Sequence, residues 1–155
     1  MAGIFIDEGP LAMVAGRDKK PVTLKDVNRG TVYDGPLVLM VNGQSASASE
    51  VLAASIQDYN RGLIVGSTTY GKATGQNVFP IESASVSATA NTSNAGYVKV
   101  TTQKLFRVTG KSAQGTGVKP DVLIPDVFMA MNISESQAPF ALRRDSILMN
   151  PYYKP

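Results

Sequence analysis

The chain has 155 residues, of which 43% are hydrophobic and 17% are charged, a balance typical of a globular domain. It contains no His and no Cys, which excludes a Ser-His-Asp triad, a cysteine nucleophile, disulfides and His/Cys zinc sites. The formal net charge is only +3 and the basic residues are scattered, so no nucleic-acid-binding face is expected. An enzyme built from this chain must take its acids and bases from Asp, Glu, Lys or Tyr.

The first segments in chain order are strand candidates separated by turns. Short apolar runs cover residues 11–14 and 22–24, on either side of a basic turn at residues 17–21. Residues 37–41 form a continuous apolar run, which predicts a strand covered on both faces. Because a membrane helix needs roughly 20 apolar residues, this longest run predicts no membrane span.

The clearest helix of the sequence lies at residues 48–59. Ser47, followed three residues later by Glu50, matches a capping box at its start, and Gly62 stands where a left-handed residue would end it. Residues 63–65 predict a second buried strand, so strand, helix and strand together predict a βαβ unit. The apolar residues at helical spacing, which predict one buried stripe, are Ala48, Val51, Leu52, Ile56 and Tyr59.

The remaining chain is predicted to be mainly β-structure and loops. Residues 77–81, 97–108 and 122–125 are strand candidates, whereas residues 82–94 are rich in small polar residues and predict an exposed loop. The expected fold class is therefore α/β, with additional strands beside the βαβ unit.

Residues 45–50 (Ser-Ala-Ser-Ala-Ser-Glu) place serines at a strand-to-helix junction. A hydroxyl there lies at a helix N-terminus, where free N–H groups and the helix dipole stabilise an oxyanion. The alternative interpretation is that Ser47 is only an N-cap residue, which is the commoner role of such a serine.

Lys72 lies in a weakly polar, glycine-bounded segment after the second buried strand. Burial lowers the pKa of an amine toward neutrality, which would make Lys72 a general base for a serine. Gln76 would then orient the amine through its side-chain carbonyl. Taken alone, Lys72 is better interpreted as a solvated loop residue, and Gln76 is equally well interpreted as a surface residue of a strand.

Residues 66–72 also match the pattern Gly-x-x-x-x-Gly-Lys of a phosphate-binding loop, except at the next position. Ala73 stands where that loop needs a Ser or Thr for Mg²⁺, and residues 73–80 do not predict the helix that the loop must open. Nucleotide binding is therefore the least favoured function.

In combination, these motifs resemble the C-terminal processing (tail-specific) serine peptidases. The resemblance extends over about residues 3–126 and is carried by residues 36–42, 45–51, 57–58, 64–66, 70–72 (Tyr-Gly-Lys), 76, 101–105, 117–122 (Gly-Val-Lys-Pro-Asp-Val) and 125. It implies that Ser47 is the nucleophile, Lys72 the general base, Gln76 the orienting residue and the Ala48 N–H an oxyanion donor. It further implies a ClpP/crotonase-like α/β core and no metal or organic cofactor.

The resemblance also sets expectations for domains, partners and location. Residues 1–126 would be part of a peptidase catalytic domain, and residues 127–155 a C-terminal extension or linker. The family's Asp-Leu-Arg-x-Asn-x-Gly-Gly segment and PDZ domain have no match in this sequence. We therefore expect a partial catalytic domain that is weakly active or inactive by itself. Exposed sheet edges would favour a homo-oligomer.

The function implied is that of a serine endopeptidase that cuts proteins or peptides with apolar C-terminal tails, in the periplasm or elsewhere outside the cytoplasm. The alternative is a catalytically silent scaffold or oligomerisation unit. Labelling by a serine-directed phosphonate separates the two functions, because it requires an activated hydroxyl.

Overall fold

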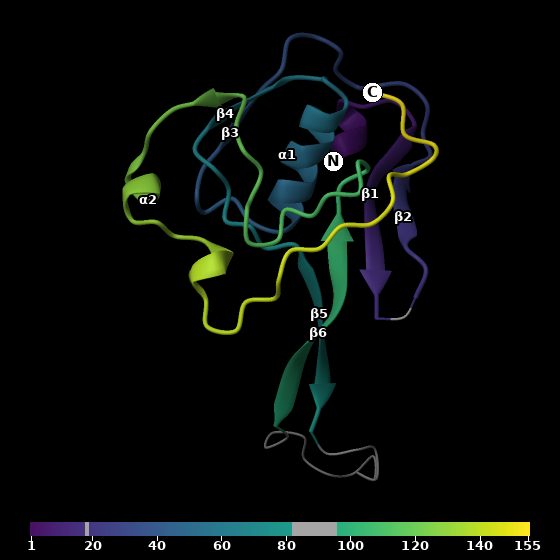
Figure 1. The fold of residues 1–155 in the computed structure, drawn as a ribbon. Coiled ribbons are helices and arrows are strands. Elements are labelled where there is room, and N and C mark those ends of the chain that lie inside the picture. The colour runs from purple at the N-terminus through teal and green to yellow at the C-terminus, as the bar shows by residue number, and fades with distance from the viewer. Residues whose placement is uncertain (18, 82–95) are drawn as a thin grey trace, which may run out of the picture.

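The structure is a computed structural model that describes residues 1–17, 19–81 and 96–155, and these form two β-sheets around one main helix (Figure 1). The elements are η1 (Ala2–Ile4), β1 (Gly9–Gly16), β2 (Val22–Asp26), β3 (Val38–Val41), α1 (Ala48–Asp58), β4 (Leu63–Gly66), β5 (Thr74–Pro80), β6 (Tyr97–Phe106), β7 (Val122–Leu123), α2 (Val127–Ala130) and η3 (Glu135–Gln137). The predicted α/β class is confirmed. The exposed loop predicted at residues 82–94 lies outside the described residues. Within the described ranges, no helix is both long and apolar enough to cross a membrane.

The smaller sheet is parallel and contains the predicted βαβ unit. β3 pairs with β4, with Val38 opposite Leu63 and Val41 opposite Gly66, and β7 pairs with the other edge of β4. Helix α1 connects β3 to β4 and packs against β4. The strands predicted at residues 37–41 and 63–65 are therefore confirmed.

The prediction that this parallel sheet is covered on both faces was wrong. Ile64 is fully buried in the core on the face toward α1, whereas Met40 is 79% exposed and Leu63 is 53% exposed. Because side chains alternate along a strand, every second residue of β3 and β4 lies on the uncovered face. A continuous apolar run therefore does not distinguish one covered face from two.

The larger sheet is antiparallel, in the order β2-β1-β6-β5. β1 pairs with both β2 and β6, and β5 pairs with β6 from Thr74 opposite Lys104 to Pro80 opposite Tyr97. Figure 1 shows the far ends of β5 and β6 projecting from the body as an arm. We call residues 76–81 and 97–101 the β-arm; its exposed apolar residues are Val78, Phe79, Ile81, Tyr97, Val98 and Val100.

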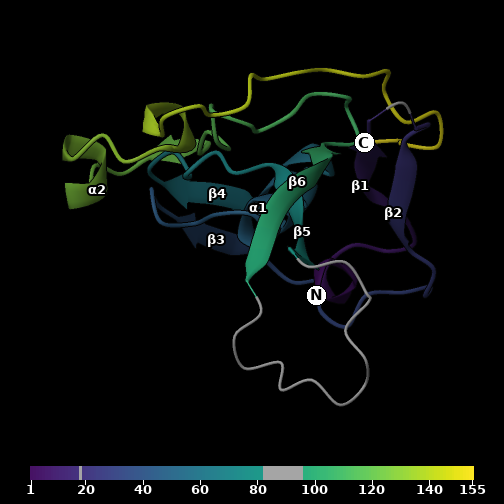
Figure 2. The same cartoon turned by 90° about the horizontal axis from the view of Figure 1, so that it is seen from below.

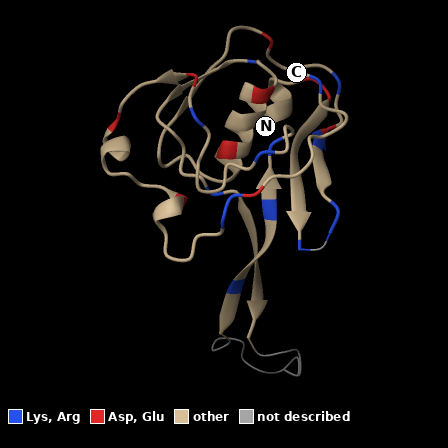
Figure 3. Cartoon of the chain, in the orientation of Figure 1, with Lys and Arg blue, Asp and Glu red and all other residues tan. Residues whose placement is uncertain are grey.

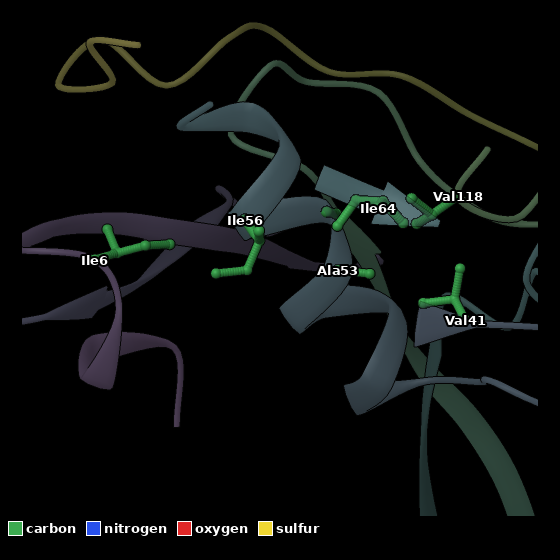
Figure 4. Packing of buried hydrophobic residues seen from close by; sticks show 7 residues of the cluster. Ile6, Val41, Ala53, Ile56, Ile64 and Val118 are labelled. Carbon is green, nitrogen blue, oxygen red and sulfur yellow. The ribbon is translucent and has the colours of Figure 1, made fainter. Parts of the chain in front are cut away.

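The core lies between α1 and the parallel sheet (Figure 4). The predicted helix is confirmed, but its predicted stripe is only partly correct. Ile56 is buried as expected, whereas Ala48 at the first turn is exposed, and Ala53 and Ala54 complete the buried face. The core residues are Ile6, Val41, Ala53, Ala54, Ile56, Ile64 and Val118.

The end of α1 differs from the prediction that Gly62 takes a left-handed conformation there. Asn60 has that conformation instead, with a φ of 50°, directly after the C-cap residue Tyr59. Asn tolerates it better than most residues with a Cβ. Gly62 instead allows the backbone before β4 to pass close to the backbone before β3, because a Cβ there would lie 2.6 Å from the carbonyl oxygen of Leu37.

Residues 126–153, which we call the C-terminal strap, run along the outside of the molecule. Figure 2 shows this segment extending from α2, beside β4, to the side of β1 and β2. The strap is hydrogen-bonded to the body: Ile147 N–H donates to Gly110 O at 2.9 Å, and Asn150 N–H to Val108 O at 2.8 Å. Tyr153 Oη also donates to Asp58 O. The domain boundary at residue 126 stays a prediction.

Candidate functional site

The site begins with the backbone of Ser47, which has a φ of 57° and a ψ of −115°. Such angles are rare for a residue with a Cβ and cost about 1–3 kcal/mol, and strain of this kind clusters at functional sites. Ser47 is also the N-cap of α1, and its N–H donates to Glu50 Oε2 at 2.9 Å. The predicted capping box is therefore present, but on a strained residue.

The turn before Ser47 connects it to the segment that carries the predicted base. Ser45 N–H donates to Asn42 O at 2.9 Å, and Asn42 N–H donates to Ser45 Oγ at 3.2 Å. Ser45 O then accepts the N–H of Tyr70 at 3.0 Å. The serine turn and the segment around Lys72 are thus joined directly through their backbones.

Ala48, the predicted oxyanion donor, is the first residue of α1. The next two amides are occupied, since Ser49 N–H donates to Ala46 O at 3.2 Å and Glu50 N–H to Ser47 O at 2.9 Å. In the part of the chain that the structure describes, the N–H of Ala48 donates to no backbone or side-chain acceptor. This leaves a free donor adjoining Ser47 at the positive end of the helix.

Glu50 joins Ser47 to the lysine loop, the name we give to residues 69–73. Glu50 is 2% exposed and is one of the two acidic positions on α1 in Figure 3. Besides Ser47 N–H, it accepts Thr69 Oγ1 at 2.5 Å, Gly71 N–H at 2.7 Å and Lys72 N–H at 2.8 Å. Four donors suit an ionised carboxylate, which only accepts hydrogen bonds.

Other segments hold the remaining polar groups of the lysine loop. The carbonyl oxygens of Tyr70, Gly71 and Ala73 accept backbone N–H groups from Glu135 (2.8 Å), Gly115 (2.8 Å) and Leu105 (2.9 Å), in that order. The N–H of Ala73 donates to the side-chain oxygen of Gln114 at 2.9 Å. The backbone of this loop is therefore fixed on both sides of Lys72.

Ser47 and Lys72 line the same small pocket, between α1, β1 and the end of β6. Lys72 is half-buried, and Glu50 also lines the pocket. Its volume is about 20 Å³, which is room for a single water molecule. Its apolar lining comprises Leu11, Ala12, Val51, Ala54, Ala73, Leu105, Phe106 and Ala113. A serine and a lysine thus line one water-sized space whose lining is otherwise largely apolar.

Arg107 also lines this pocket and is paired with the second acidic residue of α1. Its Nη2 lies 2.5 Å from Asp58 Oδ1, and its Nε donates to Asp58 Oδ2 at 3.0 Å. Because the Asp58 side chain is only 4% exposed, this pair fixes the end of α1 against the residue that follows β6.

The structure does not bring Gln76 to this pocket. Gln76 lies exposed on β5, and its Nε2 donates to Thr101 Oγ1 on β6 at 3.4 Å. The residues that line the pocket include Lys72 and Ala73 of this segment but not Gln76. Its orienting role stays a prediction.

The acidic residues suggest no metal centre. Among the described residues, no group of three or more acidic side chains lies close enough together to hold a metal ion. Asp126 caps α2 by accepting Met129 N–H at 2.8 Å, and it also accepts the Ser67 hydroxyl at 2.7 Å. The Ser67 bond, followed by the Met129 bond, lowers the pKa of Asp126 below its ordinary value.

Two residues of the site were missed by the sequence reasoning. Glu50 was expected only as a capping partner. Its position next to the buried stripe of the helix is a signal of burial, and a buried carboxylate needs hydrogen-bond donors around it. Gln114 was not singled out, and its neighbours Ala113 and Gly115 give no local pattern that would have identified it.

Comparison with known proteins assigns the family. Residues 1–124 match the model of "Peptidase family S41". The "Tail-specific protease" of Haemophilus influenzae is 36% identical over 147 residues, which are 95% of this chain and 21% of the relative. The "Carboxy-terminal-processing protease" of Bartonella bacilliformis is 31% identical over 121 residues, which are 77% of this chain and 25% of the relative.

A solved structure agrees with these relatives. The "photosystem II D1 C-terminal processing protease" is 31% identical, with a TM-score of 0.62 over 79% of this chain and 29% of the other. This chain thus spans about a fifth to a quarter of the length of the two curated relatives. The resemblance inferred from the motifs is confirmed, and the chain belongs to peptidase family S41.

Proposed function

We propose that this chain carries the serine–lysine centre of a C-terminal processing endopeptidase, with Ser47 as nucleophile and Lys72 as general base. The observation that carries the proposal is that both residues line one pocket while Glu50 binds the backbone N–H of each. A nucleophile and a base need a fixed mutual geometry, and a buried carboxylate shared by both segments supplies it.

The reaction follows from these roles. The neutral amine of Lys72 takes the hydroxyl proton as Ser47 Oγ forms a bond to the scissile carbonyl carbon, and the Ala48 N–H stabilises the oxyanion. Collapse of this intermediate breaks the peptide C–N bond, and the ammonium of Lys72 gives its proton to the leaving amine. Water, deprotonated by Lys72, then attacks the acyl-enzyme and releases the carboxylate product with Ser47 restored.

Gln76 is proposed to orient the Lys72 amine, a role that rests on its spacing from Lys72 and on the family resemblance. In the structure its side chain contacts Thr101 instead. Replacing Gln76 with Ala should slow the reaction of Ser47 with a phosphonate if the orienting role is correct. An unchanged rate would assign Gln76 to the β-arm alone.

The properties of the whole protein are also proposals. The names of the two curated relatives support substrates cut near their C-terminal ends, and we propose protein tails of apolar character. The parallel β3-α1-β4 unit supports a ClpP/crotonase-like core. We also propose that the protein lies in the periplasm or elsewhere outside the cytoplasm. We further propose that it self-associates through the exposed residues of β3.

The test is to label this chain with a fluorophosphonate and to locate the adduct by mass spectrometry. Labelling is expected at Ser47, to vanish in Ser47→Ala and to persist in the matched control Ser49→Ala. Lys72→Met should slow it by about 10²–10⁴-fold, the usual contribution of a general base. Because phosphonylation needs only an activated hydroxyl, it is expected even of a partial domain that cleaves peptides weakly or not at all. Absence of labelling in the native chain, or labelling that survives Ser47→Ala, would refute the proposal.

A silent scaffold is the second candidate, favoured by the exposed apolar residues of β3. Val38 is 58% exposed and Met40 is 79% exposed, which suits an interface between copies. A folded, unlabelled chain that self-associates in sedimentation measurements would support it. Nucleotide binding has no structural support, because Lys72 is followed by strand β5 and not by a helix.

A further inference from the structure

A glutamine that the proposed chemistry does not use lies fully buried beside the lysine loop. Gln114 is 0% exposed. Its Oε1 accepts the N–H of Ala73 at 2.9 Å, and its Nε2 donates to Glu135 Oε1 at 3.2 Å and to Leu142 O at 3.3 Å. A buried amide is costly unless its polar atoms are bonded, and here both its oxygen and its nitrogen are.

The Ala73 contact acts on Lys72 through the peptide bond between them. Two planar peptide groups flank the Cα of Lys72, and each carries one N–H. Glu50 binds the first N–H, that of Lys72, at 2.8 Å, and Gln114 binds the second, that of Ala73, at 2.9 Å. With both planes fixed, the direction in which the Lys72 side chain leaves the backbone is fixed as well.

The other end of Gln114 is held by the C-terminal strap. Both acceptors of its Nε2, Glu135 and Leu142, belong to the strap. The strap also reaches the lysine loop directly, because Glu135 N–H donates to Tyr70 O at 2.8 Å. Gln114 therefore lies in a continuous polar path from the strap to the peptide group that follows Lys72.

We infer that Gln114 is a positioning residue that aims Lys72 at Ser47, and that the strap is the part of the chain that holds Gln114 in place. The inference rests on the proposed function for the role of Lys72. Displacing a catalytic group by about 1 Å costs roughly 10²-fold in rate, so a loosened Ala73 peptide has a measurable effect on Ser47 chemistry.

The experiment compares Gln114→Leu with Asn150→Leu in this chain. Asn150 is a matched control, because it is a buried strap amide whose side chain bonds Thr23 and the N–H of Tyr152, away from the lysine loop. The readouts are the hydrogen-exchange rate of the Ala73 amide by NMR and the rate of Ser47 phosphonylation per folded molecule. Gln114→Leu should raise the exchange rate of the Ala73 amide by at least about tenfold and lower the rate of Ser47 phosphonylation by about 100-fold. Asn150→Leu should lower stability without either change.

A second pair of variants keeps side-chain sizes nearly constant. Gln114→Glu retains an acceptor for the Ala73 N–H but loses the donor to both Glu135 and Leu142 O. Adding Glu135→Gln restores the contact between residues 114 and 135, with donor and acceptor exchanged, but not the contact to Leu142. The double variant should regain phosphonylation relative to Gln114→Glu alone, a non-additivity that indicates direct coupling. This pair decides the question if Gln114→Leu does not fold.

The outcomes separate the two proposals. A native chain that is not phosphonylated refutes the proposed function, and the exchange rate of Ala73 still decides whether Gln114 holds the loop. A native chain that is phosphonylated, with Gln114→Leu matching Asn150→Leu in both readouts, overturns the inference. Failure of Glu135→Gln to restore the rate of Gln114→Glu overturns the part assigned to the strap.

Discussion

The lysine loop and the β-arm are close neighbours in the chain, yet they are held by different interactions. The loop has no regular secondary structure, and its polar groups bond to the buried side chains of Glu50 and Gln114 and to distant backbone. The β-arm is regular, and its two strands pair with each other while its apolar side chains remain exposed.

This difference in contacts predicts that regular secondary structure is a poor guide to rigidity in this molecule. Hydrogen bonds in a buried, low-dielectric setting are stronger, and breaking one leaves its partner unsatisfied. A two-stranded ribbon with exposed side chains gains little from burial and opens at low free-energy cost. We therefore expect the irregular loop to be the less tolerant region.

Glu50→Ala should give the largest effect, because it leaves four donors in the loop and the serine turn without their acceptor. We expect the free energy of unfolding to fall by about 3–5 kcal/mol, because each buried N–H or O–H donor left without an acceptor costs about 1–3 kcal/mol. Urea denaturation measures it. The control Glu8→Ala removes an exposed ion pair with Arg29 and should cost less than about 1 kcal/mol. Equal losses would mean that the loop does not depend on Glu50.

The same substitution beside the lysine loop and in the β-arm gives the most direct comparison. Val118 is 0% exposed and its N–H and C=O bond Thr69 of the lysine loop, whereas Val78 of the β-arm is 60% exposed. Val118→Thr should cost about 1–3 kcal/mol, because it buries a hydroxyl. Val78→Thr should stay within about 0.5 kcal/mol. If the two variants shift the midpoint of thermal unfolding by similar amounts, the lysine loop is no less tolerant than the β-arm.

A smaller effect is expected from relieving the strain at Ser47. The β-arm has no residue with a Cβ at positive φ among those described, whereas Ser47 has a φ of 57°. Ser47→Gly should therefore be more stable than Ser47→Ala by about 1 kcal/mol, since only glycine adopts this conformation without strain. Both variants lack the nucleophile, so the difference between their free energies of unfolding in chemical denaturation reports the backbone strain at residue 47. An alanine variant at least as stable would show that the serine turn stores no strain.

Local patterns in the sequence were sufficient to predict the parts of the fold that depend on neighbours in the chain. The capping box of Ser47 and Glu50 and the apolar runs of β3 and β4 are of this kind, and the structure confirms them. The family resemblance predicted Ser47 and Lys72 together, and they line one pocket.

The remaining features depend on segments that are far apart in the chain. The fourfold bonding of Glu50 and the burial of Gln114 arise only when loop, helix and strap have assembled, so no spacing rule identifies them. The exposed face of β3 and β4 was missed for the same reason, because coverage depends on which elements pack above the sheet.

The path of the strap also sets an order of events during protein synthesis. A ribosome releases the chain from its N-terminus at about 5–20 residues per second, so Ser47 and Lys72 emerge before Glu135 and Leu142 have been made. Until those residues leave the exit tunnel, Gln114 lacks both acceptors of its Nε2. A nascent chain therefore carries its serine and lysine without the full set of contacts that fixes them, and the site is completed only on a polypeptide translated well past residue 142.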